Sequence, residues 1–126
     1  MVGLAVVSHS GKAAEGIAEV AGEMAGDTRI ESVGGDGQGG FGTVADDIED
    51  AIDAADGGGG VVVLVDLGSA VMNAEVAIEL SDSEAVIADA PVLEGAVNAA
   101  VAATSPKATV ESVVEQAEAA RDIDKL

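Results

Sequence analysis

The 126-residue chain has 24 Asp and Glu against five Lys and Arg, a formal net charge of −19, and only 1% aromatic residues. A surface of this charge repels DNA, RNA and anionic membranes, and bases find no Trp or Tyr ring on which to stack. We therefore expect no nucleic-acid partner and no membrane partner. The chain has no cysteine, and its acidic residues show no clustered ligand pattern, so we expect no disulfide and no metal site.

The acidic excess is typical of a protein from a high-salt cytosol, such as that of a halophile, because molar salt shortens the Debye length to about 3 Å and screens self-repulsion. The chain is nevertheless 48% hydrophobic, which predicts one folded domain spanning residues 1–126. Its core is expected to consist of Val, Ala, Ile and Leu, with Phe41 as the sole ring. The first apolar run is too short for a signal peptide or a membrane span, so a cytoplasmic location is expected.

Strand and helix patterns alternate along the chain. Short valine-rich runs predict strands, and apolar residues spaced three to four apart predict helices. The predicted strands are residues 2–7, 28–33, 61–65 and 85–88, and the predicted helices are residues 12–25, 43–55, 69–80, 92–103 and 109–121. This alternation predicts an α/β, flavodoxin-like three-layer fold with a parallel four-stranded sheet of order 2-1-3-4 and about five helices.

Three local features refine the helix predictions. Ser10 is the expected N-cap of the first helix. The apolar spacing in that helix predicts that Met24 lies on its buried stripe. Thr43 with Asp46 resembles a capping box at the start of the second helix.

His9 is the only histidine, and it follows the first strand directly. Asp66 follows the third strand, and the predicted order places the ends of these two strands side by side at the switch point of the sheet. A carboxylate that accepts a hydrogen bond from one imidazole nitrogen fixes the tautomer and presents the other nitrogen as a nucleophile. We therefore predict that His9 is a phosphohistidine nucleophile and that Asp66 orients it.

Helix starts next to these residues offer N–H and hydroxyl groups to a phosphoryl group. The candidates for this role are Ser10, Gly11, Gly68 and Ser69. The glycine loop, residues 34–42, follows the second strand and lies at the same edge of the predicted sheet. It is expected to close over the site or to contact a partner, with Gly39, Gly42 and Thr43 as the partner-loop residues.

Plainer interpretations remain open for each residue. His9 is also suitable as a capping or exposed loop histidine. Asp66 and Ser69 are suitable helix caps, and the glycine loop is also a suitable mobile connection. Residues 35–40 spell G-x-G-x-x-G, which would allow a dinucleotide or flavin site, although the motif follows the second strand in a glycine-rich run. Ser69, His9 and Asp66 together would make a serine hydrolase triad, but the G-x-S-x-G elbow is absent.

Several segments resemble one family: Val-Val-Ser-His9-Ser, the loop ending at Gly42-Thr43, the Asp66-Leu-Gly-Ser-Ala-x-Met-Asn73 block, and Ala90-Pro-x-x-Glu-Gly95. They are similar to the mannose-type enzyme IIA domains of the phosphoenolpyruvate-dependent phosphotransferase system (PTS). Within that family the chain resembles the phosphocarrier subunits of PTS-dependent dihydroxyacetone kinases.

The resemblance implies that His9 accepts the phosphoryl group from phospho-HPr and passes it to ADP in the nucleotide-binding subunit L of the kinase, which works with subunit K. It implies a homodimer, with no tightly bound cofactor beyond the transient phosphoryl group. The alternative is an enzyme IIA component of a mannose-type sugar phosphotransferase or a phosphorylation-sensing regulatory module.

Overall fold

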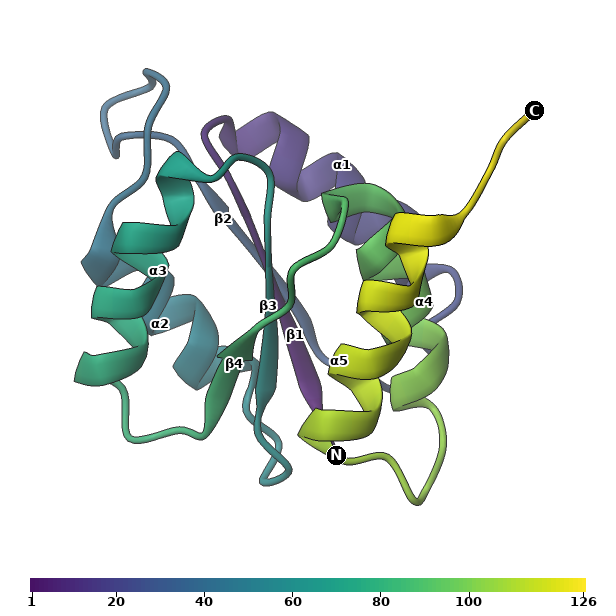
Figure 1. Cartoon of the computed structure of the whole chain (residues 1–126). Coiled ribbons are helices and arrows are strands. Elements are labelled where there is room, and N and C mark those ends of the chain that lie inside the picture. Colours follow the sequence, from purple (N-terminus) through teal and green to yellow (C-terminus); the bar gives the residue numbers. More distant parts are fainter.

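Four parallel strands form the central sheet of the molecule, in the order β2-β1-β3-β4 (Figure 1). The computed structural model describes residues 1–126. The strands are β1 (Gly3–Ser8), β2 (Ile30–Gly34), β3 (Val61–Val65) and β4 (Ala85–Ile87). The predicted strand order and parallel direction are therefore confirmed, with boundaries shifted by one or two residues.

Five helices cover the two faces of the sheet. They are α1 (Gly11–Gly22), α2 (Ala45–Ala55), α3 (Ser69–Leu80), α4 (Val92–Ala103) and α5 (Val110–Ala119), with a short 3-10 turn at Ala120–Asp122. Helices α2 and α3 lie on one face, and α1, α4 and α5 lie on the other (Figure 1). The three-layer α/β fold is confirmed.

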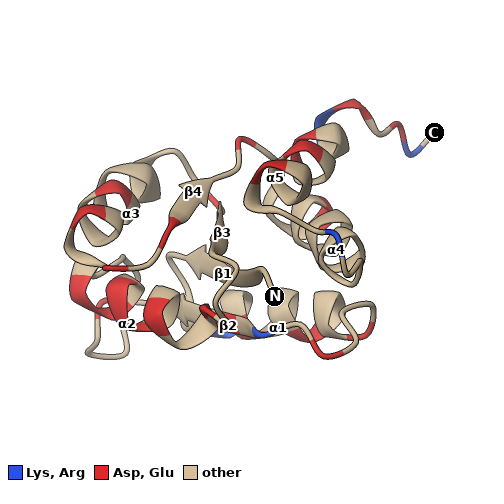
Figure 2. Cartoon of the chain, turned by 90° about the horizontal axis from the view of Figure 1, so that it is seen from below, with Lys and Arg blue, Asp and Glu red and all other residues tan.

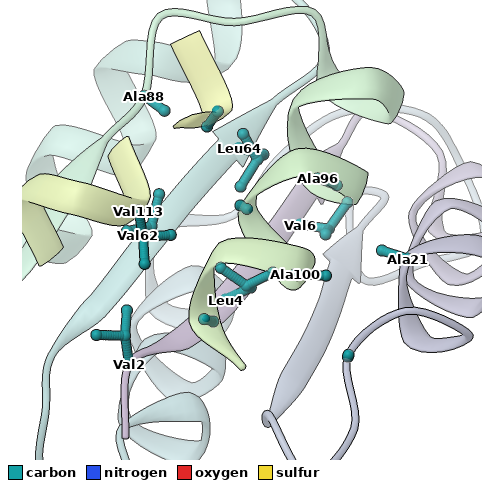
Figure 3. Packing of buried hydrophobic residues seen from close by; sticks show 14 of the residues in the cluster. Val2, Leu4, Val6, Ala21, Val62, Leu64, Ala88, Ala96, Ala100 and Val113 are labelled. Atoms are coloured by element: carbon teal, nitrogen blue, oxygen red, sulfur yellow. The ribbon is translucent and has the colours of Figure 1, made fainter. Parts of the chain in front are cut away.

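Strand β1 is buried on both faces, and its side chains alternate between two hydrophobic cores. Leu4 and Val6 belong to the larger core, which packs against α1, α4 and α5. Ala5 and Val7 belong to the smaller core, which packs against α2 and α3. Figure 3 shows the larger core, where Leu4 and Val6 lie close to the inner side of α4. Packing on both sides holds the end of β1, and hence the residues that follow it, in one position.

The cores are built from aliphatic side chains, as expected, but the single aromatic ring takes no part in them. Phe41 is 83% exposed. Helix α4 instead packs on the sheet through small residues, and a Cβ at Gly95 would lie 2.9 Å from the Cβ of Ala90 and 3.2 Å from Cδ1 of Leu64. The core is therefore filled because α4 lies close to the sheet, without bulky aromatic side chains between them.

The prediction that Met24 is buried is wrong. Helix α1 ends at Gly22, and Met24 is 55% exposed. Beyond the helix the N–H groups of Met24 and Ala25 bond three residues back, to Ala21 and Gly22. This tighter turn rotates Met24 outward and buries Ala25 instead.

The predicted capping box of Thr43 and Asp46 is also wrong. Helix α2 begins at Ala45, and its N-cap is Val44, whose side chain makes no capping hydrogen bond. The Thr43 hydroxyl accepts a hydrogen bond from Asn73 of α3 instead. The hydroxyl oxygen of Thr43, which would have capped α2, therefore accepts a hydrogen bond from another helix.

The negative charge is spread over the outer faces of the helices, most densely on α2 (Figure 2). This placement leaves both cores free of charge, and Glu31 of β2 is the one charged residue within the strands of the sheet. None of the helices combines the length and the apolar character that a membrane span requires.

Candidate active site at the ends of β1 and β3

His9 and Asp66 leave the sheet from neighbouring strands. Val7 of β1 pairs with Val65 of β3 in the register of the sheet, and the chain leaves each strand within two residues of that pair. The Nδ1 atom of His9 lies 3.0 Å from Oδ1 of Asp66. The switch point between β1 and β3 therefore contains a direct imidazole–carboxylate pair.

The carboxylate of Asp66 is a hub that accepts four hydrogen bonds. Its Oδ1 accepts from the imidazole of His9 and, at 2.8 Å, from the N–H of Leu67. Its Oδ2 accepts from the N–H of His9 at 3.0 Å and from the hydroxyl of Ser8 at 2.9 Å. The interpretation of Asp66 as a simple helix cap does not fit, because the N-cap of α3 is Gly68.

These contacts set the ionisation state of Asp66. Partial burial would raise the pKa of this carboxyl, but the hydrogen bonds from His9, Ser8 and Leu67 outweigh burial and lower the pKa below its ordinary value. Asp66 is therefore ionised at neutral pH and can only accept. It follows that Nδ1 of a neutral His9 carries the proton and that Nε2 carries the lone pair.

The Nε2 atom of His9 lies 2.9 Å from the hydroxyl of Ser69, the first residue of α3. With the proton on Nδ1, the Ser69 hydroxyl donates to Nε2. The imidazole is thus held at both nitrogens, and its side chain is 25% exposed. A partner can reach Nε2 from solvent once the Ser69 hydroxyl turns away.

Ser8 belongs to the site and was missed by the sequence reasoning. It is 1% exposed, its hydroxyl donates to Asp66, and its oxygen accepts from the N–H of Ser10 at 3.1 Å. A serine that ends a fully buried apolar strand needs a polar partner, and that need was the signal available in the sequence.

The other predicted phosphoryl-binding residues lie at two helix starts beside His9. Ser10 is the N-cap of α1, as predicted, and its hydroxyl accepts from the N–H of Ala13. Gly11 is the first residue of α1, and Gly68 is the N-cap of α3. Both helix starts therefore bring the positive ends of their dipoles to the same edge of the sheet.

The glycine loop is fastened to the site at both ends, because it begins at Gly34, which pairs with Ser8 in the sheet. The N–H of Gly42 donates to the carbonyl of His9 at 2.9 Å, and Thr43 bonds to Asn73 of α3. Gly39, also a predicted partner-loop residue, is exposed and makes no hydrogen bond to His9 or Asp66. Asn73 is thus a second residue that the sequence reasoning did not place in the site, although it lies in the block that carries the family resemblance.

Two cavities lie beside the site, and both have charged side chains in their linings. A cavity of about 470 Å³ lies between the glycine loop and the start of α1, lined by Gly11, Lys12 and Phe41 among others. A second cavity of about 390 Å³ is lined by Asp66 and Leu67 among others. No group of three His, Asp or Glu side chains is placed to hold a metal ion.

The fold and the site define a class of protein: an α/β three-layer fold whose lone histidine, at the end of the first strand, is oriented by an aspartate at the end of the third. The family model described as "PTS system fructose IIA component" (EIIA-man) matches residues 3–114. The chain therefore belongs to the EIIA-man family, which confirms the family resemblance of the sequence.

Two relatives are named as subunits of a kinase. The "PEP-dependent dihydroxyacetone kinase 2, phosphoryl donor subunit DhaM" of Listeria innocua is 44% identical over 80% of this chain and 85% of its own length. The "PTS-dependent dihydroxyacetone kinase, phosphotransferase subunit DhaM" of Lactococcus lactis is 34% identical over 92% of this chain and 93% of its own length. A crystal structure described as the "unknown function protein EF1359" matches with a TM-score of 0.78 and 28% identity, over 94% of this chain and 93% of that one.

Proposed function

We propose that this chain is the phosphoryl-donor subunit of a phosphoenolpyruvate-dependent dihydroxyacetone kinase, and that it works as a phosphohistidine carrier. The observation that carries the proposal is the imidazole of His9, which the ionised Asp66 holds at Nδ1 and whose side chain is 25% exposed. The names of the relatives from Listeria innocua and Lactococcus lactis support the assignment to this kinase.

In the first step, the lone pair on Nε2 of His9 attacks the phosphorus of a phosphohistidine on HPr. The P–N bond of the donor breaks as the new P–N bond forms, and the electron pair stays with the donor imidazole. No oxidant, metal or net proton is needed for this exchange. The proton on Nδ1 of His9 remains hydrogen-bonded to Asp66, which stabilises the positive charge that develops on the ring.

The neighbours of His9 stabilise the transferred group. The hydroxyl of Ser69, which donates to Nε2 in the unmodified protein, is free after phosphorylation to donate to a phosphoryl oxygen. The starts of α1 and α3, at Gly11 and Gly68, favour negative charge at this place. The residues that would hold the group thus come from two helices fixed by the same sheet.

In the second step, an oxygen of the β-phosphate of ADP attacks the phosphorus, and His9 leaves as a neutral imidazole. The ADP belongs to the nucleotide-binding subunit L of the kinase, and subunit K holds the dihydroxyacetone. We further propose a single enzyme IIA domain over residues 1–126, a cytoplasmic location and a homodimer. Sedimentation equilibrium at molar KCl tests the homodimer.

A second candidate function is an enzyme IIA component of a sugar phosphotransferase, which the description of the matching family favours. Both functions use phosphorylated His9, but they differ in the acceptor. Reconstitution with purified kinase subunits L and K separates them, because only the first function yields dihydroxyacetone phosphate.

The experiment that tests the proposal measures the intact mass of the protein after incubation with phosphoenolpyruvate, enzyme I and HPr in high salt. We expect one added phosphoryl group that is labile in acid and absent from His9→Ala. Because His9 is the only histidine, no second imidazole complicates the result. Failure of a folded wild-type protein to gain mass, or phosphorylation of His9→Ala, would contradict the carrier function.

A further inference from the structure

The glycine loop contains six glycines in nine residues, and little of it is held by packing. Gly37 and Gly39 have positive φ angles, and a Cβ at either would meet nothing within 4 Å. A segment of this composition loses much conformational entropy when it takes one shape. Specific hydrogen bonds must therefore account for its position.

Within the loop, Asp36 closes the tip on itself. Its Oδ1 accepts from the N–H groups of Gln38 at 2.8 Å and Gly40 at 2.9 Å, and its own N–H donates to the carbonyl of Gly40 at 3.1 Å. These contacts shape the tip but do not attach it to the rest of the protein.

The attachment to α3 comes from one side chain, Asn73. Its Nδ2 group donates to Oγ1 of Thr43 at 2.7 Å and to the carbonyl of Thr43 at 3.2 Å. Ser69 and Asn73 are four residues apart on α3, so they lie on the same face of the helix. The first contacts the imidazole of His9, and the second contacts the loop that runs beside it.

The end of the loop that is attached to α3 includes the only aromatic ring of the chain. Phe41 precedes Gly42, whose N–H bonds to the carbonyl of His9, and Phe41 lines the cavity at the start of α1. Its 83% exposed side chain packs on nothing that would hold it in place. The contact between Asn73 and Thr43, together with the hydrogen bond of Gly42, therefore sets where the ring stands relative to His9.

We propose that Asn73 is a positioning residue for the protein partners of His9. It fixes the glycine loop on α3 and thereby presents Phe41 to the docked phosphoryl donor protein. The imidazole does not depend on this contact, because Asp66 and Ser69 hold its two nitrogens. The inference rests on the proposed function of His9 and adds to it a residue that acts on docking and not on the transfer chemistry.

The test compares Asn73→Asp with Asn98→Asp. Asn98 of α4 also donates from Nδ2 to a main-chain carbonyl, that of Gln116 at 3.1 Å, so both variants lose a side-chain hydrogen bond and gain one negative charge. We expect the KM for phospho-HPr to rise about tenfold in Asn73→Asp, because a carboxylate cannot donate to the carbonyl of Thr43 and repels it, and to stay at the wild-type value in Asn98→Asp.

Phosphoramidate is the second probe, because this small phosphoryl donor reaches His9 without docking. We expect Asn73→Asp and Asn98→Asp to react with it at the same rate. A KM for phospho-HPr that is equal in the two variants would overturn the inference. So would a phosphorylation rate of Asn73→Asp that falls below the wild-type rate by the same factor with phospho-HPr and with phosphoramidate. A wild-type protein that reacts with neither donor would instead overturn the proposed function.

Thr43 supplies an independent pair of variants should Asn73→Asp fold poorly. Thr43→Val removes the acceptor hydroxyl with almost no change of shape, whereas Thr43→Ser retains it. We expect a raised KM for phospho-HPr in Thr43→Val and a KM near the wild-type value in Thr43→Ser. Equal KM values in these two variants would contradict the positioning role.

Discussion

The imidazole of His9 and the carboxylate of Asp66 lie 3.0 Å apart although 57 residues separate them in the chain. The parallel pairing of β1 with β3 creates this contact, because it places the carboxyl ends of the two strands at one edge of the sheet. Asp66 also accepts the main-chain N–H of His9, so the same carboxylate holds both the ring and the backbone of the proposed nucleophile.

The first prediction concerns Asp66→Asn. In the variant an NH2 group replaces one of the two acceptor oxygens. This NH2 group then faces groups that are themselves hydrogen-bond donors, and the tautomer of His9 is no longer fixed. We expect an unchanged far-UV circular dichroism spectrum. We expect the rate of phosphoryl transfer from phospho-HPr to fall by a factor of about ten or more. Rapid-quench measurement of phosphorylated His9 gives this rate.

Asp56→Asn is the matched control for Asp66→Asn. Hydrogen bonds from the N–H groups of Gly58 and Gly60 also lower the pKa of Asp56, but this residue precedes β3 and lies at the opposite end of the sheet from His9. We expect its transfer rate to match the wild type. Equal rates for Asp66→Asn and Asp56→Asn would show that Asp66 has only a structural role.

The second prediction concerns acid stability. Because the folded protein lowers the pKa of Asp66, the ionised carboxylate contributes stability above its unfolded pKa of about 3.9, and this contribution is lost as the pH falls through the folded pKa. We expect the midpoint of urea unfolding at pH 7 to be higher for the wild type than for Asp66→Asn. We expect this difference to shrink towards pH 3. A difference that stays constant over this range would contradict the assignment.

The third prediction concerns salt. Partial desolvation and the repulsion of neighbouring acids, with Asp53 first among them, raise the pKa of Glu49 on α2. For an acid with a raised folded pKa, stability falls as the pH rises through that pKa, so charge on α2 opposes folding at neutral pH. We expect the Tm to rise steeply with KCl, and Glu49→Gln to raise the Tm in dilute buffer but not at 2 M KCl. A Tm independent of KCl would contradict a high-salt origin.

The fourth prediction concerns Gly34, the last residue of β2. A Cβ there would lie 2.5 Å from the carbonyl oxygen of Ser8 and 2.8 Å from that of Ser10, so alanine forces the site apart. We expect Gly34→Ala to lower the free energy of unfolding by about 1–3 kcal/mol and to slow phosphorylation of His9. Urea unfolding and the intact-mass assay measure the two effects.

Gly16 provides the opposite case for comparison with Gly34. It lies within α1, and a Cβ there would meet nothing within 4 Å. We expect Gly16→Ala to raise the free energy of unfolding by about 0.5–1 kcal/mol through helix propensity alone, with unchanged phosphorylation. Similar behaviour of the two alanine variants would show that close approach at Gly34 is not needed.

The fold could be predicted from the sequence because its signals are local and agree with one another. The unbroken run Val61–Val65 and the apolar spacing around Ile48 and Ile52 each allow one kind of element, and the alternation of these elements allows few topologies. The juxtaposition of His9 and Asp66 followed from the strand order alone.

What could not be predicted depends on side chains that meet only in the folded protein. The hydroxyl of Thr43 has a suitable place for a capping box, but Asn73 competes for it from another helix. The burial of Met24 depends on where α1 ends, and apolar periodicity does not resolve a difference of three residues at a helix end. Ser8 joined the site through the carboxylate of a residue distant in sequence.

The exposed ring of Phe41 gives the molecule an unusual spectroscopic simplicity. Once the amide protons are exchanged in D2O, the aromatic region of its proton NMR spectrum contains the ring protons of one phenylalanine and one histidine. The first ring stands in the loop that we propose for docking, and the second carries the proposed chemistry. A single titration with a perdeuterated partner can therefore follow encounter and phosphoryl transfer as two separate sets of resonances, without isotope labelling of this chain.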